Sequence, residues 1–82
     1  MILSDTLPNK HYIVNKVTHK DNELRRILDM GIISGTKIVK LFSSPFGDPT
    51  AYEIKNSVIA LRKTDSDKIF VEDAGDNIGP QP

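Results

Sequence analysis

The fold of this chain is decided by one stretch, L-R-R-I-L-D-M-G-I-I-S-G-T, which runs from Leu24 to Thr36. Leu24, Ile27 and Leu28 stand at positions i, i+3 and i+4, and this spacing predicts one apolar face of a short helix. Gly31 follows where a helix end favours a residue that tolerates a positive φ. A helix this short is not stable alone in water, so the rest of the chain must supply the sheet on which it packs.

Runs of β-branched and aromatic residues on both sides of that stretch predict five short strands, at residues 10–17, 37–42, 50–55, 58–63 and 69–71. Ser34-Gly35 predicts the turn that precedes the second of these strands. Val14 and Val17 are three residues apart, so the first strand needs a bulge if both side chains face inward. Asn56-Ser57 has the two-residue spacing of a tight hairpin turn. Thr64–Asp67 can cap a single helical turn before the last strand.

The ends of these elements complete the predicted architecture. The aliphatic residues of segment 1–9 (Ile2, Leu3 and Leu7) should lie across the sheet, and Asp21 or Asn22 should be the helix N-cap. We expect one domain over residues 1–73 and a frayed tail over 74–82. The prediction is a mainly β fold: a small, strongly bent five-stranded barrel with one short α-helix inserted after the first strand.

Composition narrows the possible classes of protein. The 82 residues contain no cysteine, which excludes disulfides and cysteine-ligated metal centres. No apolar run approaches the ~20 residues of a membrane span, and the N-terminus lacks a signal-peptide pattern, so we expect a cytoplasmic protein without membrane insertion. The net charge is zero, from 11 basic and 11 acidic residues. It divides into +4 over residues 1–64 and −4 over residues 65–82.

The chain shows no pattern for a metal, a cofactor or catalysis. His11 and His19 stand at opposite ends of one predicted strand, too far apart to share an ion, so we interpret them as exposed or structural. The run that starts at Asp65-x-Asp67 has Phe70 where a calcium loop needs Gly. A serine–histidine pairing and a glycine-rich phosphate loop are both missing from the sequence, so no enzyme is expected.

Three segments carry a resemblance to a known family: R-R-I-L-D-M-G-I-I-S-G-T-K-I (Arg25–Ile38), S-P-F-G-D-P (Ser44–Pro49) and I-A-L-R (Ile59–Arg62). Over residues 10 to 72 the chain resembles the FeoA family, small cytoplasmic SH3-like proteins that accompany the ferrous iron transporter FeoB. Lys40 occupies a place that is usually aliphatic in that family. The resemblance implies a non-enzymatic accessory role: docking to the cytoplasmic part of the transporter and modulating Fe²⁺ uptake.

Four residues are our predicted partner-binding set: Leu24, Arg26, Met30 and Phe46. Leu24 begins the helix near solvent, Met30 lies on the flank of its core face, and Phe46 stands in a proline-rich loop. Packing in the core is the alternative for each apolar member. If two or more are exposed together, they form an apolar patch suited to protein binding.

Two other functions are compatible with a small barrel. One is a nucleic-acid-binding module that uses the arginines with Lys37, Lys40, Lys55 and Lys63; zero net charge argues against it, because such proteins carry a basic excess. The other is a metal-responsive or metal-carrying module, since the same SH3-like domain also occurs in iron- or manganese-responsive repressors. We predict no nucleic-acid partner, and the sequence leaves the oligomeric state open.

Overall fold

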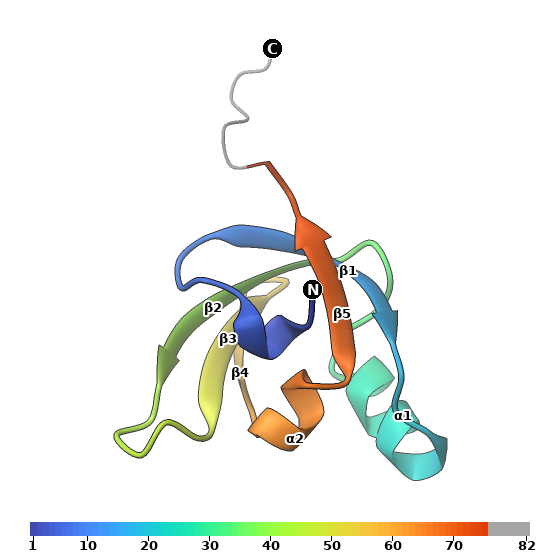
Figure 1. Cartoon of the computed structure of the whole chain (residues 1–82). Coiled ribbons are helices and arrows are strands. Elements are labelled where there is room, and N and C mark those ends of the chain that lie inside the picture. Colours follow the sequence, from blue (N-terminus) through green and yellow to red (C-terminus); the bar gives the residue numbers. More distant parts are fainter. Residues whose placement is uncertain (76–82) are drawn as a thin grey trace.

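The structure, a computed structural model, describes residues 1–75 and is mainly β, as predicted (Figure 1). Five antiparallel strands form one sheet in the order β4-β3-β2-β1-β5. The helix α1 follows the first strand, β1, and a 3₁₀ helix, η1, precedes that strand. A short second helix, α2, lies before the last strand. The bounds are η1 Leu3–Asp5, β1 His11–Val17, α1 Asp21–Asp29, β2 Lys37–Ser43, β3 Thr50–Ile54, β4 Ser57–Leu61, α2 Lys63–Ser66 and β5 Ile69–Asp73.

The sheet is strongly bent but not closed into a barrel. Within residues 1–75 the end strands β4 and β5 pair only with β3 and β1, respectively, apart from the isolated bridge of β5 to Ile2. The outer edge of β5 is covered by the N-terminus, where the Val71 amide donates to the Met1 carbonyl at 2.8 Å. The bulge predicted in the first strand is confirmed, because the β1–β5 register shifts between Val14 and Lys16.

The core fills the concave side of the sheet and is closed by α1 and η1. Tyr52 and Ile54 alternate along β3, and both are buried as their two-residue spacing predicts. From the N-terminal segment Leu3 is fully buried, whereas Leu7 is 60% exposed. The buried cluster comprises Leu3, Tyr12, Val14, Ile27, Ile32, Ile38, Tyr52, Ile54, Leu61, Ile69 and Val71.

The helix α1 buries a narrower face than its spacing predicts. Ile27 is fully buried, but Leu28 is 41% exposed and Leu24 is only half-buried. The predicted N-cap is also wrong: Lys20 holds that position without a side-chain hydrogen bond, and the helix starts at Asp21. Because α1 meets the sheet along one line of contact through Ile27, the leucines beside it stay accessible to solvent.

The hairpin between β3 and β4 turns one residue earlier than predicted. Ile54 pairs with Ser57, so the two-residue turn is Lys55-Asn56 and Ser57 belongs to β4. Lys55 and Asn56 have φ of 50° and 65°. A two-residue turn of this kind needs two left-handed residues, and Asn adopts that conformation more readily than Ser.

The predicted helical turn before the last strand is α2, but its own side chains do not cap it. The N-cap is Arg62, without a side-chain hydrogen bond. Of the predicted tail, residue 74 still donates its amide to the His11 carbonyl at 3.1 Å, and residues 76–82 lie outside the described part of the chain. None of the helices in residues 1–75 has the length and apolar character needed to cross a membrane.

Candidate functional site

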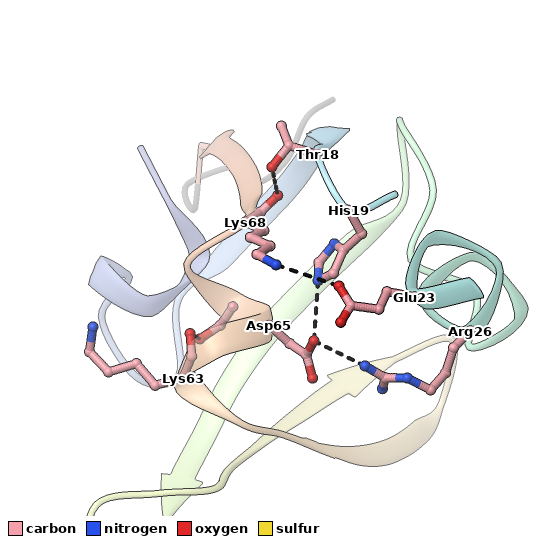
Figure 2. Close-up of polar contacts among 8 residues, drawn as sticks. Thr18, His19, Glu23, Arg26, Lys63, Asp65 and Lys68 are labelled. Carbon is pink, nitrogen blue, oxygen red and sulfur yellow. Dashed lines mark hydrogen bonds and ion pairs between the residues drawn. The ribbon is translucent and has the colours of Figure 1, made fainter. Parts of the chain in front are cut away.

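The surface of α1 is the candidate site, and a polar cluster fixes how this helix sits on the sheet (Figure 2). His19, in the link between β1 and α1, has a fully buried side chain whose Nε2 lies 3.2 Å from Oδ1 of Asp65 on α2. The same carboxylate oxygen accepts a hydrogen bond from Nη2 of Arg26 at 3.0 Å. Asp65 therefore joins the start and the middle of α1 to α2.

A second ionic contact holds the first turn of α1. Nζ of Lys68 lies 3.5 Å from Oε1 of Glu23, and the carbonyl of Lys68 accepts hydrogen bonds from the amide and hydroxyl of Thr18, both at 2.9 Å (Figure 2). Both side chains of the ion pair are largely exposed, so the contact orients the helix more than it stabilises it.

His19 carries an unsatisfied atom at the centre of this cluster. Asp65 is an acceptor, so the ring proton in their contact belongs to Nε2, and Nδ1 is buried without a hydrogen-bond partner in the described residues. An imidazole nitrogen of this kind can bind a metal, but no group of three His, Cys, Asp or Glu side chains converges anywhere in residues 1–75. The contact that the structure shows for His19 is the one with Asp65, which positions α1.

The outer face of α1 is open and partly apolar. Leu24 and Leu28 lie in a hollow on this face, flanked by Arg25 and by the carboxylates of Asp21 and Asp29. The leucines are one helical turn apart, so their side chains are neighbours on the surface. An apolar strip between charged groups of both signs is suited to contact with another protein.

The predicted partner-binding residues fall in two separate places. Leu24, Arg26 and Met30 belong to α1 and its C-terminal end, where Met30 is the C-cap and packs partly against the core. Phe46 lies in the loop between β2 and β3 and is 95% exposed. In Figure 1 that loop and α1 lie on opposite sides of α2, so the structure does not bring Phe46 together with the other three.

Leu28 and Phe42 are exposed apolar residues that the sequence pattern did not identify. The helical spacing predicted Leu28 in the core, but it is 41% exposed, and Phe42, in a predicted strand, is 66% exposed. A β2–β3 register shift between Lys40 and Phe42 changes which side chains face inward. The three-residue spacing of Val14 and Val17 predicted the bulge in β1, but the sequence of β2 contains no comparable spacing.

The lysines proposed for nucleic-acid binding do not share one surface. Lys37 and Lys55 line an open hollow together with Glu53. Lys40 donates to the Ser4 carbonyl at 3.0 Å, and Lys63 is paired with Asp67, the C-cap of α2.

Comparison with known proteins gives a consistent family. The family model described as FeoA domain matches residues 1–73. A Porphyromonas gingivalis protein, an Fe(2+) transport protein A/Fe(2+) transporter FeoB fusion protein, is 30% identical over all 82 residues. The chain covers 100% of its own length but only 10% of that relative.

Solved structures give the same fold. Iron(II) transport protein A from Clostridium thermocellum matches with a TM-score of 0.87 at 31% identity, over 92% of this chain and 46% of that chain. FeoA of Stenotrophomonas maltophilia, solved with zinc and described as a prokaryotic SH3 domain protein, matches with a TM-score of 0.76. That match covers 88% of this chain and 89% of that chain at 24% identity, so it identifies the fold as SH3-like.

Proposed function

Because the chain belongs to the FeoA family, we propose that it is a non-enzymatic accessory protein of ferrous iron uptake that contacts a FeoB-type transporter directly. A role in ferrous iron transport follows from the family. The observation that carries the proposed contact is the Porphyromonas gingivalis relative, in which the two functions are joined in one polypeptide. Covalent fusion keeps two domains at high effective concentration, which favours a contact between them.

The proposed contact surface is the outer face of α1, with Leu24 and Leu28 at its centre and Arg26 at its edge. The exposed leucines supply apolar area, and Arg25 beside them supplies a charge that an acidic group on the transporter's cytoplasmic part can meet. The cluster around Asp65 supports this assignment, because it holds α1 in one orientation before binding and lowers the cost of ordering it.

Phe46 is a second proposed contact, on a different side of the molecule. A side chain that is 95% exposed contributes almost nothing to the core. Met30 packs partly against the core, so its contribution to binding is expected to be small. A transporter segment that touches both α1 and the β2–β3 loop has to extend past α2.

Binding of the purified protein to the cytoplasmic domain of its transporter tests the proposal. Leu28→Asp and Leu24→Asp should weaken the complex by about tenfold or more while circular dichroism stays unchanged. Leu7→Asp is the matched control, because Leu7 is also an exposed leucine and lies outside α1. Equal binding by all variants would contradict the α1 surface, and no binding by the wild type would contradict the contact itself.

Phe46→Asp separates the two regions. A loss of binding in Phe46→Asp alone would assign the contact to the β2–β3 loop. A loss of binding both in Phe46→Asp and in the two leucine variants would favour a partner segment that contacts α1 and the β2–β3 loop and extends past α2.

A further inference from the structure

A polar hollow lies at the end of the sheet farther from α1, between η1, β2, β3 and α2. Its volume is about 180 Å³. The lining is dominated by hydroxyl groups and two lysine ammonium groups, which are hydrogen-bond donors. The residues are Ser4, Lys40, Ser43, Gly47, Thr50, Tyr52, Lys63 and Ser66. This hollow is separate from the α1 surface and serves no part of the proposed contact.

Lys40 is the central group because it is a lysine on the inner side of the sheet. It stands two residues after the fully buried Ile38 on β2 and pairs with the buried Tyr52 on β3. Its Nζ donates to the Ser4 carbonyl at 3.0 Å, and no other hydrogen bond or ion pair of this ammonium occurs in residues 1–75. Burial lowers the pKa of Lys40, and the charge of Asp5 raises it by less.

The ammonium group of Lys40 therefore has donor capacity left over. An ammonium carries three N–H donors, and one of them is used. Burial of this cation is costly, and the charge of Asp5, which forms no ion pair with it in residues 1–75, offsets only part of the cost, so an anion placed in the hollow would stabilise it.

The other lining groups add donors on further sides. The hydroxyls of Ser43 and Thr50 lie 2.9 Å apart, so one of the two hydrogens serves their mutual bond and the other is available. The carboxylate of Asp67 already accepts hydrogen bonds from Ser4 and from Nζ of Lys63. Its charge is thus balanced by Lys63, whereas the charge of Lys40 is offset only in part by Asp5.

We propose that this hollow binds a phosphate group through the Lys40 ammonium and the hydroxyl hydrogen that the Ser43–Thr50 pair leaves free. A tetrahedral oxyanion presents acceptors in several directions, which matches donors that come from two strands, β2 and β3. A planar carboxylate accepts mainly in its own plane, so it matches donors from several directions less well than a phosphate does.

Titration of the ¹⁵N-labelled protein with inorganic phosphate, followed by amide chemical shifts, tests the site. Shifts should concentrate on the amides around the hollow and saturate at millimolar phosphate. Lys40→Met keeps the buried stem but removes the charge, and it should weaken apparent affinity by about tenfold or more. Lys37→Met is the matched control, because it removes the same charge from the exposed, opposite face of β2 and should leave affinity unchanged.

Further ligands identify the chemistry. Glycerol phosphate should cause the same shifts if the hollow recognises a phosphate group that belongs to a larger molecule. Weaker shifts with glycerol phosphate than with inorganic phosphate would mean that the hollow prefers the free ion. If Lys40→Met fails to fold, Thr50→Val provides the test, with a smaller loss of affinity expected. Equal shifts with acetate, a loss in Lys37→Met as large as in Lys40→Met, or no saturation by phosphate would each overturn the proposal.

Discussion

The carboxylate of Asp48 accepts a hydrogen bond from the backbone amide of Lys63 at 2.9 Å, so the loop between β2 and β3 caps the N-terminus of α2. The first amides of a helix lack partners within the helix, and a side-chain oxygen commonly satisfies one of them. Here the oxygen comes from 15 residues earlier in the chain. The contact ties an exposed loop to the helix that carries Asp65.

Replacing this cap should destabilise the protein. We expect Asp48→Ala to lower the free energy of unfolding by about 1 kcal/mol, because the Lys63 amide loses its side-chain acceptor. Asp48→Asn keeps an acceptor oxygen and should cost less. Urea unfolding followed by circular dichroism measures both values. Equal stability of Asp48→Ala and the wild type would show that water replaces the carboxylate without cost.

Truncation of two neighbouring residues of α1 should destabilise the protein by very different amounts. Ile27→Ala creates a cavity in the core and should cost about 2–5 kcal/mol. Leu28→Ala removes a side chain that is 41% exposed, so it should cost about 1 kcal/mol or less. Chemical denaturation of the pair measures the difference. A larger loss in Leu28→Ala would contradict the orientation of the helix.

The cluster of His19, Arg26 and Asp65 should stabilise the protein mainly through the contact of the buried His19 with Asp65. Asp65→Ala leaves the Nε2 proton of His19 without an acceptor in a buried place, which should cost about 1–3 kcal/mol. Arg26→Ala removes a half-exposed partner of the same carboxylate, and less than about 1 kcal/mol should be lost. Thermal unfolding of both variants checks this order, and a reversed order would mean that Arg26, rather than His19, depends most on Asp65.

Stability should fall in acid because two carboxylates have lowered pKa values in the folded protein. The pKa of Asp67 is lowered by hydrogen bonds from Ser4 and then Lys63, and that of Asp73 by Lys10 and then the Gly75 amide. As the pH falls below the ordinary value of 3.8, the unfolded chain binds protons first. The stabilisation present above that pH is therefore lost as the pH passes through the folded-state pKa values.

Urea unfolding between pH 5 and pH 2 tests this dependence (about three pH units span both states of a carboxylate). Asp67→Asn and Asp73→Asn should each flatten the acid slope. Asp29→Asn is the control, because Asp29 makes no hydrogen bond or ion pair within residues 1–75. A slope unchanged in both variants would assign the acid sensitivity to other groups.

Sequence patterns predicted the strands well because two-residue alternation depends on the burial of one face of a sheet. Tyr52 and Ile54 on β3 are an example, and the three-residue spacing of Val14 and Val17, which breaks the alternation, predicted the bulge in β1. The helix α1 was predicted as an element, but not its orientation, because Leu28 has the same helical spacing as a core residue. Which of two adjacent apolar positions faces the sheet depends on where the helix sits, and that is set by contacts such as His19–Asp65.

The candidate sites were less predictable because they join segments that are distant in sequence. Leu24 and Arg26 could be proposed from the helix alone. The neighbours of Lys40, by contrast, come from η1 and β3, and its inward orientation follows from the pairing with Tyr52. The capping of α2 by Asp48 likewise needs the β2–β3 loop to fold back, and no local motif encodes it.

The hairpin between β3 and β4 allows a test that separates two neighbouring turns. With Lys55-Asn56 as the turn, Asn56→Gly places glycine at a left-handed position and should stabilise the protein by up to about 1 kcal/mol. Ser57→Gly places glycine in a strand and should destabilise it by about 0.5–1 kcal/mol. The turn read from sequence, Asn56-Ser57, requires the opposite sign for Ser57→Gly. Urea unfolding of the two glycine variants therefore distinguishes the two turns, because Ser57→Gly is destabilising only if the turn is Lys55-Asn56.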